Sequence, residues 1–412
     1  MTAPLYIALR FATHRKRALL LSLVGVVFGV GIFICTQAQT QGFMQFFINS
    51  TIGSNGALTL RSRFQPRYEG MVVSAKSPAG VSLRRNYFEG INNVSEIMRV
   101  SRQFSNVIAC SPVLRGSINA RAGFEGTTAE VFGIDPASHL RATDLEKQII
   151  DGSYNDFRNN TSSLIVGYRL ADLLHVGIGD SVQLLSPGGE YWRFNVAATN
   201  RSGVAAIDSS RVYAQQRVAQ RLLKKPYQAS MIIYKLRDPG RAPALATQFE
   251  NLFQHSAQSW QDREEGNLQI FATLRISAAI TVSLIILLAG FGIFNVLTMS
   301  VLSKIREIAI LRSMGYRRID ISAIFLWQGA LIAAIGSLFG CALGALLTLA
   351  ISKVPIHIRG LLYANHFLVV WDWRHYFWAT VLAIISVFIA SYVPAQRAAQ
   401  LAPVDTLRGS SL

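Results

Sequence analysis

The sequence predicts a membrane protein with four transmembrane α-helices and a large α+β domain between the first and second. Of its 412 residues, 51% are hydrophobic and only 15% are charged, whereas a soluble chain carries about 25% charged residues. About 20 apolar residues of helix cross the hydrocarbon core of a bilayer. Four stretches without Asp, Glu, Lys or Arg meet that length: 18–35, 276–302, 321–351 and 376–396.

The first apolar stretch has the basic start and apolar middle that are also typical of a secretory signal peptide. Thr36-Gln37-Ala38 would be a weak cleavage site. The apolar stretch is longer than the core of a signal peptide, which has about 7–15 residues. We therefore interpret it as a retained transmembrane helix.

The distribution of basic residues predicts the topology. A net charge of +17 would suit a nucleic-acid-binding protein, but the short basic clusters flank the apolar stretches. Short Lys/Arg-rich segments stay in the cytoplasm, so both termini are expected there, and no nucleic-acid partner is expected. The expected order is N-terminus 1–17, helix 18–38, external domain 39–270, helix 271–302, short cytoplasmic helix 303–320, helix 321–351, external loop 352–375, helix 376–396 and C-terminus 397–412.

The segment expected outside the cytoplasm mixes helix and strand patterns. Apolar spacing predicts helices in 93–104 and 243–253, and short β-prone runs predict strands in 106–116 and 127–136. Residues 164–180 have the pattern of a strand, a turn at Gly167 and a short helix, and 181–199 that of a hairpin. We expect one α+β unit that is interrupted by an insert richer in strands.

No pattern in the chain predicts catalysis. The seven histidines lack the paired spacing of a metal site, no Ser lies in a Gly-x-Ser-x-Gly turn, and Cys110 is the only cysteine in the expected external domain. Asp135, Asp180 and Asp208 adjoin turn residues and are expected to accept hydrogen bonds from local backbone N–H groups. The sequence contains no phosphate-binding Gly-x-x-x-x-Gly-Lys-Ser/Thr loop, so we expect no cofactor in this chain.

The short basic segment between the second and third apolar stretches, "SKIREIAILRSMGYRRID", predicts a helix with apolar stripes. Ile305, Ile308, Ala309 and Arg312 recur at helical spacing, Ile310, Leu311 and Met314 form a second edge, and Gly315 is a plausible helix stop. Three interpretations compete. The helix could lie on lipid headgroups, form a solvated loop, or dock into a groove on a cytoplasmic partner, which the apolar anchors favour.

This segment and its surroundings resemble the ABC-transporter permeases of the macrolide-exporter superfamily. The motif "EIAILRSMG", the ending "SYVPAQRAAQLAPVDTLRG" and the opening "IALRFATHRKRALLLSLVGVVFGVGIFI" carry the resemblance, which covers nearly the whole chain. Two stretches of the external segment, "AAIDSSRVYAQQRVAQRLL" and "IVGYRLADLLHVGIGDSVQLLSP", are most similar to the lipoprotein-releasing (Lol-type) permeases.

The resemblance implies a non-catalytic subunit that pairs with a dimeric ABC ATPase, which binds ATP and Mg, and with a second identical or paralogous permease. A periplasmic chaperone or adaptor and membrane lipid are further implied partners. ATPase motion would reach the periplasmic domain to extract lipoproteins; export of a peptide, drug or glycolipid and mechanical signalling without transport are the alternatives. The implied coupling residues are Lys304, Arg306, Glu307, Ile308, Leu311, Arg312, Met314 and Gly315.

Two further sets of residues have a spacing that predicts a role. Gly25, Gly29, Gly336, Gly340 and Gly344 recur every four residues, a spacing that lets helices approach closely, either within the subunit or between subunits. Phe43, Phe46 and Phe47 follow the first apolar stretch. They are either interfacial anchors or, in a lipoprotein-releasing permease, residues at the exit for acyl chains.

Overall fold

The computed structural model describes residues 16–62, 65–66, 87–88, 90–225, 229–354 and 366–400. Most of the expected termini, 1–17 and 397–412, and part of the expected loop 352–375 lie outside the described residues. The chain divides into two compact units. The first comprises 1–44, 269–356 and 365–412, and the second comprises 45–268 and 357–364.

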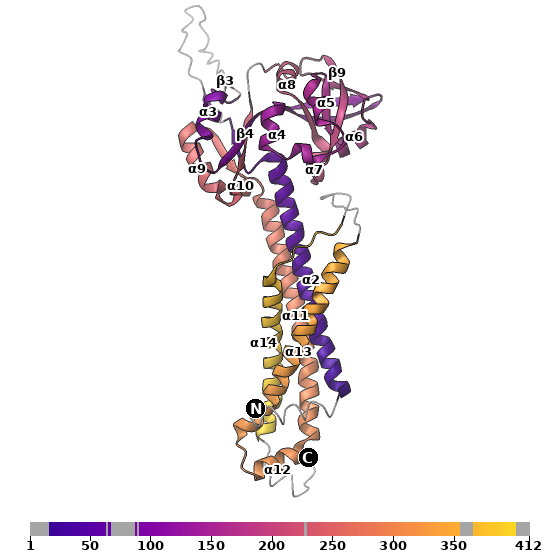
Figure 1. Cartoon of the computed structure of the whole chain (residues 1–412), viewed down its shortest axis with the longest axis vertical. Coiled ribbons are helices and arrows are strands. Elements are labelled where there is room, and N and C mark those ends of the chain that lie inside the picture. The colour runs from indigo at the N-terminus through magenta and orange to yellow at the C-terminus, as the bar shows by residue number, and fades with distance from the viewer. Residues whose placement is uncertain are drawn as a thin grey trace, which may run out of the picture. The chain divides into compact units, whose positions relative to one another are not determined.

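The first unit is a bundle of four long helices that lie side by side (Figure 1). These are α2 (Lys16–Asn55), α11 (Glu265–Ser303), α13 (Arg318–Ser352) and α14 (Trp373–Gln400). All four are long and apolar enough to cross a membrane.

All four helices are longer than the predicted spans. With 40 and 39 residues, α2 and α11 are each about 60 Å long, twice the thickness of the hydrocarbon core. Hydropathy marks only the part of a helix that suits the membrane. The polar segment after residue 38 contains no proline, so the helical hydrogen bonds of α2 continue to Asn55.

The core of the bundle is made by apolar side chains from all four helices. Thirteen buried residues form one cluster, in which Val30 and Ile293 are fully buried. Ala379 and Ala383, which are also fully buried, let α14 pack closely on its neighbours.

The second unit contains one ten-stranded sheet with the order β12-β1-β11-β4-β5-β10-β7-β9-β6, while β8 pairs with both β4 and β9. Its strands are β1 (Leu58–Arg61), β4 (Val107–Ala122), β5 (Glu125–Ile134), β6 (Ile149–Gly152), β7 (Ser163–Gly167), β8 (Ser181–Leu185), β9 (Tyr191–Asn200), β10 (Arg211–Gln215), β11 (Met231–Leu236) and β12 (Ser256–Ser259). A separate pair joins β2 (Gln65–Pro66) to β3 (Tyr87–Phe88). Among described residues, β10–β5 and β7–β9 are the parallel pairs.

The helices of this unit are short. They are α3 (Val94–Ser101), α4 (Pro136–Ala142), α5 (Tyr154–Asn159), α6 (Tyr168–Leu174), α7 (Ala205–Ser210), α8 (Gln216–Leu222), α9 (Ala242–Phe253) and α10 (Trp260–Arg263), with 3-10 turns at Leu145–Gln148 and Pro239–Arg241. The predicted helices in 93–104 and 243–253, the strand–helix pair after residue 163 and the hairpin in 181–199 are all confirmed.

Two of the buried clusters in this unit lie on different groups of strands. One core joins β1, β11 and β12 to α3 and α9, and Tyr234 and Phe249 stack edge-on inside it with centroids 5.2 Å apart. The other takes alternate residues from β4, β5, β7, β8, β9 and β10 and covers them with α6 and α8. Strand β4 belongs to both because its first half pairs with β11 and its second half with β5 and β8.

The three aspartates expected as local caps all accept backbone hydrogen bonds. Asp135 accepts from Ser138 N at 3.0 Å, and Asp180 accepts from Gly177 N at 2.8 Å. Asp208 is fully buried and accepts from the backbone N–H of Ser202 at 2.8 Å and of Gly203 at 3.3 Å. This prediction is confirmed. Burial raises the pKa of Asp208, although hydrogen bonds from Ser202 oppose that rise.

Candidate coupling site

The predicted cytoplasmic helix is present as α12 (Ile305–Ser313), which connects α11 to α13 and lies across one end of the bundle (Figure 1). The chain leaves α11 through Lys304, whose ψ of 14° interrupts the helical path. The Lys304 ammonium lies 2.5 Å from the Glu307 carboxylate. This places an acidic group in the first turn of α12, where it complements the helix dipole.

One stripe of α12 is buried against its own bundle. Ile308 is 1% exposed and packs in a cluster with Ile324 and Phe325 of α13 and Ala395 and Ala398 of α14. Leu311 is half-buried against the same cluster. These two side chains therefore hold α12 in place.

Arg312 supplies a polar link at the same end of the bundle. Its Nη1 donates a hydrogen bond of 3.0 Å to the carbonyl of Ala399 in the last turn of α14. Carbonyl groups in the last turn of a helix have no partner within that helix, and a cation is favourable there. Arg312 thereby connects α12 to α14.

Gly315 ends α12 in a left-handed conformation with a φ of +97°. Its backbone N–H donates to the carbonyl of Arg312 at 3.2 Å. The backbone N–H of Tyr316 donates to the carbonyl of Leu311 at 3.3 Å. These are the two hydrogen bonds of a Schellman motif. The Asp320 carboxylate then accepts a hydrogen bond of 2.9 Å from the backbone N–H of Arg317, and α13 begins at Arg318.

The opposite side of α12 is exposed and mixes apolar with charged groups. Ile310 is 48% exposed, Met314 is 72% exposed and Ile319, just beyond the turn, is 78% exposed. Arg306 and Glu307 are exposed as well. Of the eight expected coupling residues, the structure thus presents Arg306, Glu307, Met314 and Gly315 outward, half-buries Lys304, Leu311 and Arg312, and buries Ile308.

Two of the expected coupling residues, Ile308 and Leu311, lie on the side of α12 that packs against the bundle. Their apolar side chains are removed from water by packing against the cluster from α13 and α14. The predicted helix has two apolar edges that are similarly hydrophobic. The sequence does not indicate which of these side chains pack against the bundle. Ile310 and Ile319 are the outward apolar groups that the expected set omitted.

Comparison with known proteins identifies this architecture. A model described as "MacB-like periplasmic core domain" matches residues 19–252, and one described as "FtsX-like permease C-terminal" matches residues 279–403. The chain belongs to the MacB-like permease family. It is an ABC-transporter permease of the Lol/MacB type, with transmembrane helices and a periplasmic-type α+β domain.

Several curated relatives of this permease match along most of its length. A lipoprotein-releasing system transmembrane protein LolC of Neisseria meningitidis serogroup B is 24% identical, with 92% of this chain and 98% of that protein covered. An uncharacterized ABC transporter permease YknZ of Bacillus subtilis is also 24% identical, with 96% of each covered. A macrolide export ATP-binding/permease protein MacB of Bartonella henselae is 24% identical over 84% of this chain but only 52% of its own length.

The repeated glycines of the permease lie between helices of the same chain. A Cβ on Gly29 would lie 3.1 Å from Ile286 of α11, and one on Gly25 3.3 Å from Ala289. On α13, a Cβ on Gly336, Gly340 or Gly344 would come within 3.0 Å of Val26, Val30 or Ile34 of α2. The small residues therefore set how closely α2 approaches α11 and α13.

The three phenylalanines after the first apolar stretch have different surroundings. Phe43 stacks edge-on with Phe367, with ring centroids 6.2 Å apart. A Cβ on Gly203 would come within 2.8 Å of the Phe46 ring, and Phe47 is only 4% exposed. A buried Phe47 does not fit the expected role at an open exit for acyl chains.

His139 and Arg211 are titratable side chains that are buried inside the α+β domain. His139 is 1% exposed, and its Nδ1 lies 3.2 Å from Ser111 Oγ. Burial and the nearby Arg211 lower the pKa of His139 to about 3. Arg211 is buried, donates to Asn55 at 2.8 Å and lies over the Phe132 ring at 3.9 Å. Among the described residues, no group of three metal-binding side chains is present.

Proposed function

We propose that this permease subunit extracts lipid-anchored proteins from the outer leaflet of a Gram-negative inner membrane, driven by a separate dimeric ATPase that binds ATP and Mg. The single observation that supports the coupling is the geometry of α12. One side of the helix is fixed to α13 and α14, and the other presents Ile310 and Met314 among charged side chains. Such a surface suits helix-in-groove docking.

The placement of α12 explains how ATPase motion would reach the bundle. A helix that is joined to its neighbours by a buried cluster and by the Arg312–Ala399 hydrogen bond moves with them. The permease contains no phosphate-binding loop.

The cargo is proposed from the similarity to LolC, which is named as part of a lipoprotein-releasing system and matches over 92% of this chain. In this proposal a second permease, identical or paralogous, completes the transporter. Both termini are cytoplasmic, and a periplasmic chaperone or adaptor receives the cargo.

Release of cargo from reconstituted vesicles tests this proposal. The permease, its ATPase and a triacylated lipoprotein are reconstituted together, and released lipoprotein is measured with ATP and without it. We expect ATP-dependent release of the acylated protein only. Equal release of the same protein without its acyl chains would contradict the proposal.

Efflux of a peptide, drug or glycolipid is the second candidate, favoured by the MacB-like core domain that matches 57% of the chain, residues 19–252 of 412. The two candidates differ in their substrate. ATP hydrolysis that is stimulated by a soluble macrolide or peptide, but not by lipoprotein, would favour efflux.

A further inference from the structure

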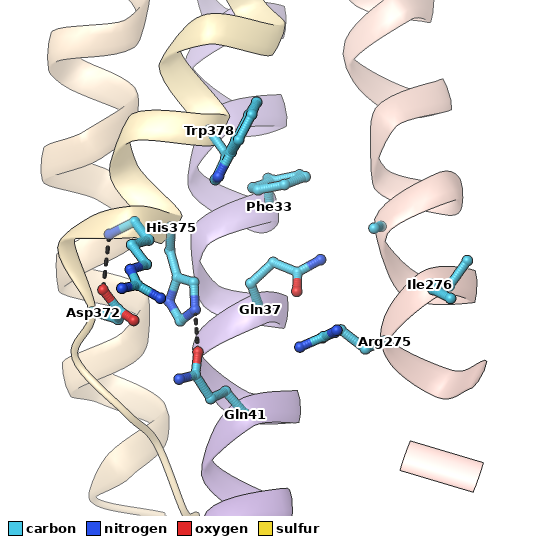
Figure 2. Close-up of a pocket in the computed structure, with 10 residues that line it drawn as sticks. Phe33, Gln37, Gln41, Arg275, Ile276, Asp372, His375 and Trp378 are labelled. Carbon is cyan, nitrogen blue, oxygen red and sulfur yellow. Dashed lines mark hydrogen bonds between the residues drawn. The ribbon is translucent and has the colours of Figure 1, made fainter. Parts of the chain in front are cut away.

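The bundle contains a cavity of about 380 Å³, lined by both polar and apolar side chains, at the end opposite to α12. Its walls come from three helices. Gln37 and Gln41 belong to α2, Arg275 belongs to α11, and Arg374 and His375 belong to the first turn of α14. Figure 2 shows Arg275 pointing from its helix toward Gln37. The volume lies in the range of small-ligand sites, about 300–1,000 Å³.

One wall of the cavity is fixed by direct contacts between α2 and the segment that leads into α14. His375 Nε2 lies 2.6 Å from Gln41 Oε1, and the N–H of Val370 bonds to the carbonyl of Ala38 at 3.0 Å. Gly42 allows this approach, since a Cβ there would overlap the carbonyl of Leu368 at 2.2 Å. The polar groups of this wall are therefore held in position before any ligand arrives.

The cavity carries a net positive charge. Its lining has two guanidinium groups, Arg275 and Arg374, and one carboxylate, Asp372, which leaves one net positive charge with His375 counted as neutral. The Asp372 carboxylate already accepts a hydrogen bond of 3.0 Å from the backbone N–H of Arg374. Neither guanidinium forms any of the ion pairs found among the described residues. The N-terminal end of α14, a helix of 28 residues, adds a further preference for an anion.

The cavity lies where three apolar stretches end. Arg275 directly precedes the uncharged stretch 276–302, His375 precedes 376–396, and Gln37 follows 18–35 by two residues. Trp371, Trp373 and Trp378 nearby are 50%, 71% and 58% exposed. Tryptophan is enriched where a membrane meets water, so the guanidinium groups lie at the depth of lipid headgroups.

We propose that this cavity binds the phosphodiester of an anionic membrane phospholipid, with Arg275 and Arg374 pairing with its oxygens and Gln37 donating from its amide. A phosphodiester carries one negative charge and matches the net charge of the lining. The acyl chains would lie along Phe33, Ile276 and Trp378, the apolar part of the same lining. This site does not depend on the proposed cargo, because the diacylglycerol anchor of a lipoprotein carries no phosphate.

The test measures lipid binding to the delipidated, full-length permease in detergent by thermal unfolding and by native mass spectrometry. The probes are phosphatidylglycerol, diacylglycerol with the same acyl chains, and inorganic phosphate. The test variant is Arg275→Gln/Arg374→Gln. The matched control is Lys353→Gln, which removes an exposed positive charge at the same end of the bundle but outside the cavity.

Phosphatidylglycerol should raise the unfolding temperature of the wild type and of Lys353→Gln, and should bind the double variant about tenfold more weakly or worse. Diacylglycerol should give no shift. An equal response in the double variant, or an equal response to diacylglycerol, would overturn the proposal. Inorganic phosphate that displaces the lipid and gives the full shift by itself would assign the site to a soluble anion and overturn the lipid assignment.

A second measurement covers the case in which the double variant does not fold. Wild-type permease in vesicles is irradiated with a photoreactive phosphatidylglycerol whose diazirine lies next to the headgroup. The label should appear in peptides that contain Ile276 or Trp378. A label confined to other parts of the bundle would also overturn the proposal.

Discussion

The Nη1 of Arg312 donates a hydrogen bond to the carbonyl of Ala399, which lies 87 residues further along the chain. This bond joins the short helix α12 to the last turn of α14. In the proposed mechanism, any force applied to α12 passes partly through it.

Arg312→Gln should therefore weaken coupling more than it weakens binding of the ATPase. The shorter amide leaves the Ala399 carbonyl without its charged partner, at a cost on the order of 1–3 kcal/mol. The measurement is cargo released per ATP hydrolysed in vesicles, together with co-purification of the ATPase. Arg312→Lys, which keeps the charge, should retain more of the wild-type ratio. An unchanged ratio in Arg312→Gln would show that this hydrogen bond is not part of the path.

Met314→Asp should weaken association with the ATPase and leave the bundle intact. Met314 is 72% exposed, so an aspartate there disturbs no packing within the chain. Leu311→Asp should instead destabilise the bundle, because Leu311 packs against the cluster around Ile308 and Phe325. Affinity for the ATPase and the unfolding temperature separate the two effects. If Met314→Asp binds the ATPase normally, the outward side of α12 is not the docking surface.

Gly315→Ala should destabilise the turn after α12 by about 1 kcal/mol. The φ of +97° is unfavourable for any residue with a Cβ, while no atom lies within 4 Å of a Cβ at this position. The cost is therefore one of backbone conformation and not of packing. Gly315→Asn should cost less, since asparagine tolerates positive φ better. Thermal unfolding of the full chain compares the three proteins, and equal unfolding temperatures would contradict this explanation.

Gly340→Ala should separate α2 from α13, because the new Cβ would lie 2.7 Å from the Cβ of Val30. Overpacking of this kind costs about 1–3 kcal/mol. The additional change Val30→Ala should restore part of the loss by making room. A double-mutant cycle on unfolding measures this coupling. Purely additive effects would mean that Gly340 and Val30 do not meet in the folded permease.

Acid should loosen the region around α4 through His139. Burial and Arg211 lower the pKa of His139 to about 3, whereas an unfolded histidine titrates at about 6.5. Between these values the unfolded state binds more protons, so stability is full above about pH 6.5 and falls as pH decreases toward 3. The loss amounts to about 1.4 kcal/mol per pH unit.

Hydrogen exchange of residues 107–142 in the full chain, measured between pH 7 and pH 5 and corrected for the intrinsic pH dependence of exchange, follows this loss. His139→Gln should remove most of the pH dependence. His175→Asn, which replaces an exposed histidine in the left-handed region, is the matched control and should behave like the wild type. A wild-type response in His139→Gln would exclude His139 as the source.

Local patterns in the sequence were enough to predict the four membrane helices, α12 and its end at Gly315, because hydropathy and glycine conformation act within a few residues. The burial of Ile308 and the exposure of Met314 could not be predicted, since both lie on apolar edges and the choice depends on α13 and α14. The end of α2 at Asn55 was missed because hydropathy does not report where a helix stops. The cavity joins residues that lie more than 300 positions apart, Gln37 and His375 among them, and no single segment contains its signal.

The strand pairings of the α+β domain have a consequence for its neighbours. Six strands pair in a closed cycle, β4 to β5, β10, β7, β9, β8 and back to β4. The two strands at the ends of the sheet order, β6 and β12, have only four residues each. If the proposed chaperone or adaptor added a strand at either end of this order, the new ladder would therefore have at most four residues. We expect such a partner to recognise mainly side chains and loops, an interface that can separate without breaking a long β-ladder.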